Sequence, residues 1–178
     1  MRRTIAFLRA FRREETATAT LEFALMLPLM MYLFFSTIEL GIFLTRQVML
    51  ERGIDIAVRQ VRIGAMDPVT HEDLVDAVCD GAGIIPDCRN QLKLEMVRRD
   101  LRNWRGFDQR ADCIDRADDE SQPPRNFEPG MQNELMVLRA CSLFDPFFPT
   151  TGLGSQLPRQ SGGAYAIVAM TAYVVEPL

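Results

Sequence analysis

The stretch that decides the fold of this 178-residue chain is Leu21-Glu22-Phe23-Ala24-Leu25-Met26-Leu27-Pro28-Leu29. It opens an apolar run that continues through Phe35 and follows the basic pair Arg12 and Arg13. The interval 23–44 contains 22 residues, close to the roughly 20 residues with which a helix crosses about 30 Å of hydrocarbon. The sequence therefore predicts one membrane-spanning helix.

The charges before this span set its orientation. Two acids, Glu14 and Glu15, stand against five cations, Arg2, Arg3, Arg9, Arg12 and Arg13. The positive-inside rule keeps such an end in the cytoplasm, so the chain after Arg46 is expected outside. A cleaved secretory signal is the alternative, but the apolar run exceeds the usual core of such signals and no small-x-small site directly follows it.

A carboxylate at the mouth of a membrane helix is costly, so Glu22 calls for an explanation. The small residues 16–20, Glu22 and Phe23 together resemble the N-terminal signature of class III prepilins, most closely the TadE-like minor pseudopilins of tight-adherence (Tad/Flp) pili. In that family a prepilin peptidase leaves a Glu fifth in the mature chain, followed by an aromatic residue. The resemblance implies a cut between Ala17 and Thr18, with 1–17 as a cytoplasmic leader, although the family usually has Gly where this chain has Ala17.

The resemblance also implies a role for Glu22, whose carboxylate would pair with the new N-terminal amine of a neighbouring subunit. The alternative is that Glu22 lies at the headgroup level and starts the helix, near the positive end of its dipole. Pro28 either bends the helix, as the common Leu-Pro pair of the family implies, or is merely tolerated there. Glu39 either lies among the headgroups or contacts a partner helix, since the family pattern also has a Glu at this place.

The remaining chain predicts an extracytoplasmic α+β domain over 46–178, after a transmembrane helix over 18–45. The helix is expected to continue beyond the membrane through Arg62, with an amphipathic pattern, and to stop at Gly64. A second helix is expected from a capping box at Thr70 to Gly81. Alternating or long apolar runs predict strands at Leu92–Met96, Leu135–Phe144 and Ala164–Val175. A long helix, a short helix and an antiparallel sheet of three to four strands give a pilin-like architecture.

All four cysteines fall on the outer side, where disulfides persist. Sequence proximity favours Cys79 with Cys88 and Cys113 with Cys141 among the three possible connectivities. A zinc site is the rival, but the chain has no Cys-x-x-Cys pair and one histidine, His71, which is expected to face solvent in the first turn of the second helix.

Two loops separate the predicted strands. The acidic segment 108–130 includes Asp112 and lacks the calcium-loop pattern, so it is expected to be a solvated loop. The segment 145–163 is rich in Pro and Gly and carries Phe147 and Phe148. These aromatics are expected either to pack under the loop or to form a contact patch for another subunit. The first strand, which alternates apolar and charged residues, is expected to be half-buried.

No catalytic constellation is present in the sequence, so we expect neither an enzyme nor a cofactor. Residues 46–178 carry 15 Lys and Arg against 20 Asp and Glu, which argues against nucleic-acid binding. The resemblance implies a minor pseudopilin of the inner membrane, with the prepilin peptidase, other pilins and the Tad inner-membrane assembly platform as partners. The alternatives are an unprocessed, membrane-anchored periplasmic binding or sensor module and an assembly adaptor that never enters the fibre.

Overall fold

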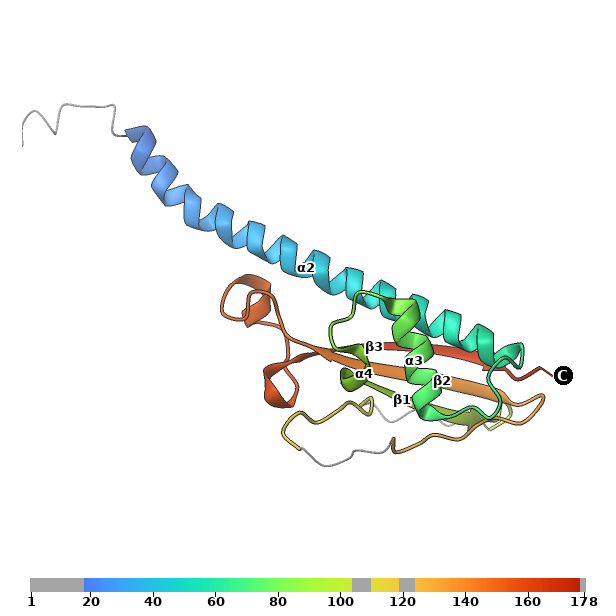
Figure 1. Ribbon diagram of the computed structural model, residues 1–178. Helices are drawn as coiled ribbons and strands as arrows, with labels where there is room; N and C mark the ends of the chain where they lie inside the picture. The colour runs from blue at the N-terminus through green and yellow to red at the C-terminus, as the bar shows by residue number, and fades with distance from the viewer. Residues whose placement is uncertain (1–17, 104–109, 119–123, 177–178) are drawn as a thin grey trace, which may run out of the picture.

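A computed structural model describes residues 18–103, 110–118 and 124–176 of the chain, so the predicted leader and Ala17 lie outside the described residues. Helix α2 (Thr18–Arg62) has 45 residues and holds the predicted span and its continuation in one element. Its first half projects from the molecule, while its second half packs on a sheet together with α3 (Figure 1). The structure thereby confirms the α+β fold and the long N-terminal helix.

The C-terminal end of α2 is closed by a Schellman motif. The Ala65 amide donates to the Gln60 carbonyl over 3.0 Å, and the Gly64 amide donates to the Val61 carbonyl over 3.1 Å. Gly64 has a φ of 68°, a conformation that glycine adopts without steric cost. The predicted stop at Gly64 is confirmed.

Helix α3 (His71–Ala82) begins as predicted, because the Thr70 hydroxyl accepts a 3.1 Å hydrogen bond from the Asp73 amide. The predicted end at Gly81 is wrong, since the helix continues to Ala82 and Gly83 follows it with a φ of 65°. Gly81 instead lies where α3 crosses α2. A Cβ atom on Gly81 would stand 3.0 Å from Cα of Gly53, so the two glycines allow a close approach of the backbones.

The sheet contains β1 (Leu92–Arg99), β2 (Leu135–Phe144) and β3 (Tyr165–Val174), antiparallel in the order β1-β2-β3. A short helix, α4 (Cys88–Gln91), leads into β1, and two 3-10 turns, η2 (Gly152–Ser155) and η3 (Ser161–Gly163), lie between β2 and β3. The three predicted strands are confirmed, with β1 extending three residues beyond Met96. The register places Leu94 opposite Ala140 and Ala140 opposite Ala169.

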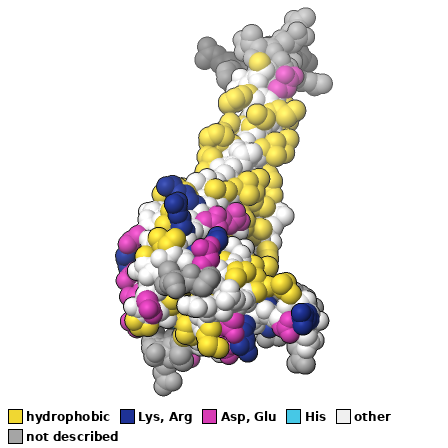
Figure 2. Space-filling model, turned by 90° about the vertical axis from the view of Figure 1, so that its right-hand side faces the viewer, with side chains coloured by type: hydrophobic (Ala, Val, Ile, Leu, Met, Phe, Trp, Pro, Cys, Tyr) yellow, Lys and Arg dark blue, Asp and Glu magenta, His cyan; other side chains and the backbone are white. Residues whose placement is uncertain are grey.

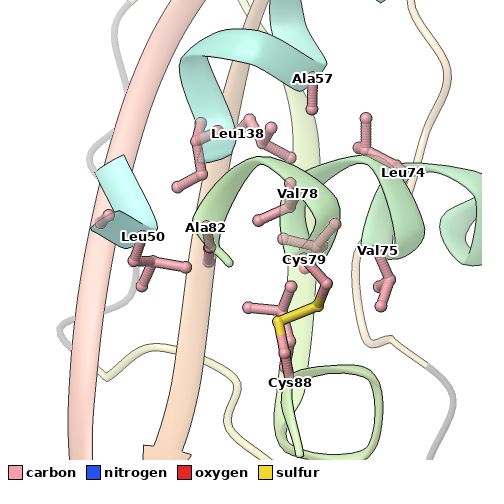
Figure 3. Packing of buried hydrophobic residues seen from close by; sticks show 14 of the residues in the cluster. Leu50, Ala57, Leu74, Val75, Val78, Cys79, Ala82, Cys88 and Leu138 are labelled. Atoms are coloured by element: carbon pink, nitrogen blue, oxygen red, sulfur yellow. A yellow bond between two sulfur atoms is a disulfide. The ribbon is translucent and has the colours of Figure 1, made fainter. Parts of the chain in front are cut away.

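The main core lies between one face of this sheet and the two helices α2 and α3. Figure 3 shows Leu50 and Ala57 of α2, Leu74 and Val78 of α3 and Leu138 of β2 pointing into it; all five side chains are fully buried. Burial of a leucine or valine side chain contributes roughly 1.5–3 kcal/mol. The second half of α2 is therefore part of the core of the α+β domain.

Both disulfides that sequence proximity favoured are present. Cys79 and Cys88 connect the end of α3 to α4, with a Cα–Cα distance of 5.7 Å, and their bond is visible in Figure 3. Cys113 and Cys141 connect a loop segment to β2 over a Cα–Cα distance of 5.2 Å. The second bond holds that segment against the face of the sheet that the helices do not cover.

At β1 and β2 that face is buried as well, which corrects two predictions. Lys93 and Glu95 of β1 are each only 5 % exposed, so β1 is not a half-buried strand at these positions. Asp112, expected in a solvated loop, is also 5 % exposed. The physical reason is charge pairing: Lys93 Nζ lies 3.1 Å from Asp112 Oδ2, and Arg139 Nε donates to Glu95 Oε2 over 2.6 Å. The segment that contains Asp112 therefore packs over β1, and its carboxylate neutralises the buried ammonium of Lys93.

The prediction for His71 is wrong, since its ring is partly buried and packs edge-on against Phe127 at a centroid distance of 5.3 Å. Its Nε2 atom accepts a 3.3 Å hydrogen bond from the amide of Leu94. Because that nitrogen accepts, the ring is bound in its neutral form. Burial lowers the pKa of His71, the charge of Lys93 adds to that effect, and Glu72 opposes it.

Candidate functional site

The largest exposed apolar surface is the projecting half of α2. Every residue from 19 to 34 is exposed, and the run includes Phe23 at 64 % and Leu25 at 71 % exposure. On the face that Figure 2 shows, hydrophobic side chains predominate along this projection, in contrast to the mixed surface of the domain. Within the described residues, α2 is the one helix long and apolar enough to cross a membrane. The chain thus has one N-terminal helix compatible with single-pass anchoring.

Glu22 and Phe23 lie near the start of this exposed half. Among the described residues, the Glu22 carboxylate has no hydrogen-bond or ion-pair partner, and its side chain is exposed. Thr18 is the first residue of α2 as the structure describes it. The carboxylate is therefore free to meet a group outside these residues, but its pairing with a neighbouring amine stays a prediction.

Pro28 lies inside α2, ten residues after Thr18, and helix continues on both sides of it. Its missing amide removes one intrahelical hydrogen bond without ending the element. Proline at this place is compatible with an unbroken helix, and a functional bend stays a prediction.

Glu39 is buried although it belongs to the predicted span, with 1 % of its surface exposed. Its Oε1 accepts a hydrogen bond from the Phe147 amide over 3.1 Å, and its Oε2 accepts one from the Phe148 amide over 2.9 Å. The carboxylate thus attaches the segment between β2 and β3 to α2. Contact with a partner helix stays a prediction, and any such contact would have to share a carboxylate that is already bound twice.

The segment 145–160, called here the junction loop, continues along α2 from this attachment (Figure 1). The Phe148 ring packs on Phe35 at a centroid distance of 4.8 Å, whereas Phe147 is 64 % exposed. The two aromatics therefore differ. Phe148 packs under the loop, as the first alternative predicted, and Phe147 is available for a contact, as the second requires.

Two further contacts bring the junction loop closer to the N-terminus. Gly152, with a φ of 58°, approaches α2 so closely that a Cβ atom there would stand 2.7 Å from Oγ of Ser36. Gln156 Nε2 donates to the Tyr32 hydroxyl over 3.1 Å. The loop therefore lies beside α2 from Tyr32 to Glu39. This contact was not predicted from the sequence. The two features that could have indicated it are Gly152 in the uncharged stretch of the loop and Glu39 in an apolar helix.

Arg46 lies at the domain end of this contact between the junction loop and α2. Its guanidinium lies over the Phe144 ring, 4.5 Å from the centroid, in a cation–π arrangement. Burial lowers the pKa of Arg46, while the charges of Glu39 and Asp145 oppose that effect. Arginine stays protonated at physiological pH, so the group adds a fixed positive charge beside the junction loop.

A cleft of about 520 Å³ opens at the opposite end of the domain. Its walls are mainly apolar and include Val61, Met66, Met96, Tyr173 and Val175. The Tyr173 hydroxyl contacts Sδ of Met96 at 3.1 Å, and burial raises the pKa of Tyr173 to about 12. Over residues 18–103, 110–118 and 124–176, no group of three or more His, Cys, Asp or Glu side chains could hold a metal ion.

The comparison with known families concerns the same helix. The model of the family described as TadE-like protein matches residues 17–59, an interval that contains Glu22, Phe23, Pro28 and Glu39. No curated protein and no solved structure matches the chain. The match confirms the resemblance found in the sequence and indicates a component of a Tad pilus system, a structural rather than a catalytic class. The exposed half of α2 and most of its packed half thus match the model of the TadE-like family.

Proposed function

We propose that the chain is a minor pseudopilin of a Tad-type pilus. A prepilin peptidase cuts between Ala17 and Thr18, and the processed protein then enters or primes the fibre through α2. The observation that carries this proposal is the exposed apolar half of α2, which begins with Glu22 and Phe23 inside the family-matched interval.

An apolar surface of this extent needs a covering partner. Before assembly, lipid covers it, with the basic leader in the cytoplasm and the outer domain in the periplasm. After assembly, helices of other pilins or pseudopilins take the place of lipid. The Tad inner-membrane platform is the partner that moves the protein between these two environments.

The charge of Glu22 explains why cleavage would be needed before assembly. A carboxylate near hydrocarbon is costly unless a cation compensates it. The amine of Thr18 is hidden in a peptide bond until the peptidase acts. Cleavage therefore creates the cation that can pair with Glu22 of an adjacent subunit, and only processed subunits can form that pair.

A permanently anchored binding module is the second candidate, favoured by the apolar cleft of about 520 Å³. Its size and lining are typical of small-molecule sites. This candidate needs no cleavage, so processing distinguishes it from the first.

The decisive experiment is mass spectrometry of the N-terminus in membranes from cells with and without the prepilin peptidase. We expect a start at Thr18 that depends on the peptidase and is retained in A17G, the variant that restores the usual family residue. An intact leader in both strains would refute the pseudopilin assignment. E22Q is the matched variant for the later step: we expect normal cleavage but loss from sheared fibres.

Sheared fibres also separate a pseudopilin from an assembly adaptor. The pseudopilin is expected in the fibre fraction after shearing, together with the major pilin. A cleaved protein that stays wholly in the membrane fraction while pili form normally would support the adaptor instead.

A further inference from the structure

The junction loop has an unusual composition for an outer domain. Its residues 146–158, Pro-Phe-Phe-Pro-Thr-Thr-Gly-Leu-Gly-Ser-Gln-Leu-Pro, contain no charged side chain, whereas a quarter of the whole chain is charged. Asp145 and Arg159 stand directly at its two borders. The uncharged stretch contains the loop residues that contact α2 between Tyr32 and Glu39.

The length of the free helix decides where this loop must lie relative to a membrane. The charged leader residues end at Glu15, and the first helix residue in contact with the loop is Tyr32. Residues 16–31 would cover about 24 Å if all were helical, which is less than the roughly 30 Å of the hydrocarbon layer. Tilting the helix shortens the covered depth further. If α2 enters the hydrocarbon layer directly after the leader, the roughly 20 residues that cross it end at about residue 35, beside the junction loop and short of the 23–44 interval's end.

Several backbone amides and carbonyls of the loop already have hydrogen-bond partners within the protein, as a position at the hydrocarbon boundary requires. Glu39 accepts from the amides of Phe147 and Phe148, and the Arg159 guanidinium donates to the carbonyls of Pro149 and Gly154. The Tyr165 hydroxyl also donates to the Gly154 carbonyl. Irregular backbone is costly in contact with lipid unless its hydrogen bonds are made inside the protein. Several of those bonds are supplied here by side chains.

We propose that the junction loop inserts into the outer leaflet of the bilayer, with Phe147 at the boundary between headgroups and acyl chains. The ring of Phe147 is 64 % exposed, and Tyr32, beside Gln156, is 43 % exposed. Aromatic side chains are typical of this boundary, and peripheral segments enter it by about 5–10 Å. The inference rests on the anchoring of α2 in the proposed function, but it does not depend on cleavage. Its occupant is lipid rather than a second copy of the chain.

The test uses the full chain in lipid nanodiscs, with Trp104 replaced by Phe and one new tryptophan at a time. F147W probes the loop. L25W is the control within the exposed half of α2, and L101W is the control at the opposite end of the sheet, where Leu101 is 76 % exposed. Each variant is measured with lipids brominated at shallow or deep acyl positions. All three substitutions are at exposed side chains, and mass mapping of the two disulfides verifies the fold.

We expect L25W to be quenched by deep bromines, F147W to be quenched more by shallow than by deep bromines, and L101W to be unaffected. Quenching of L25W with no quenching of F147W would overturn the inference and leave the anchoring intact. Quenching of neither would refute membrane anchoring, and the proposed function with it. Quenching of F147W that is seen at one protein copy per disc and lost at several copies would identify a second copy as the occupant and overturn the lipid assignment.

Discussion

Glu39 and Phe148, 109 residues apart in the sequence, are joined by a 2.9 Å hydrogen bond from the Phe148 amide to the Glu39 carboxylate. The second carboxylate oxygen binds the Phe147 amide in the same way. One side chain in the middle of the long helix therefore holds the loop between the last two strands.

E39A is expected to release the junction loop from α2. It removes two charge-assisted hydrogen bonds, and each is worth about 1.5–3 kcal/mol. Hydrogen exchange of the Phe147 and Phe148 amides should accelerate strongly in the variant, while exchange in β2 stays slow. E51A, at an exposed glutamate of the same helix, is the control. Unchanged protection of both amides in E39A would show that other contacts hold the loop.

D112A is expected to destabilise the α+β domain by about 3–5 kcal/mol, because it leaves the buried Lys93 ammonium without its partner. The double variant K93M/D112L should recover most of this loss. Denaturant unfolding of the full chain in detergent, with both disulfides intact, measures the effect. R89Q removes an exposed cation that binds Asp76 and should change little. A D112A domain as stable as the parent would contradict the assigned role of the buried pair.

G53A is expected to disturb the crossing of α2 and α3, because the new Cβ atom would stand 2.4 Å from the carbonyl oxygen of Val78. Overpacking of this kind typically costs about 1–3 kcal/mol. The matched control is G41A in the same helix, where nothing lies within 4 Å of the new atom. Thermal unfolding should separate the two variants, and equal stability of both would show that the crossing can relax.

Stability is expected to fall on acidification through the titration of His71. Its pKa is lowered in the folded chain by burial, so the native state binds fewer protons than the unfolded state does. The free energy of unfolding therefore decreases as the pH falls below about 6.5, the ordinary value for histidine. H71Q keeps an acceptor for the Leu94 amide without titrating in this range. The difference in stability between parent and variant should change between about pH 7 and pH 5, and a constant difference would exclude His71.

C113S/C141S is expected to destabilise the domain by about 3–4 kcal/mol, the chain-entropy value for a bridge across 28 residues. The shorter Cys79–Cys88 bridge, across 9 residues, should cost about 1 kcal/mol less by the same relation. Denaturant unfolding of the two double variants compares them. Proteolysis should also begin in the segment around Asp112 in the first variant and not in the second.

Local pattern and capping were enough to predict most elements of this fold. Gly64 closes α2 and Thr70 caps α3, because both signals act through neighbouring backbone groups. The strands followed from apolar periodicity. The end of α3 was misplaced because Gly81 carries a packing role, close approach to Gly53, that looks the same in sequence as a helix stop.

The buried charges and the junction loop could not be predicted in the same way. Alternating Leu and charged residues in β1 suggest a solvent face, and nothing local reveals that Asp112 will pair with Lys93. His71 and Glu39 accept hydrogen bonds from backbone amides. Because every residue except proline has such an amide, the sequence does not indicate which one would be the partner. The sequence therefore identified Glu39 as a residue to explain, but not the loop that binds it.

The continuity of α2 has a mechanical consequence. The element runs from Thr18 to Arg62 without a loop, so the face of α2 that carries Glu22 has a fixed angular position about the helix axis relative to the core residues Leu50 and Ile54. One residue inserted between them would turn that face by about 100°. Torque on the projecting half of α2, from a neighbouring helix, is thus transmitted directly into the orientation of the α+β domain.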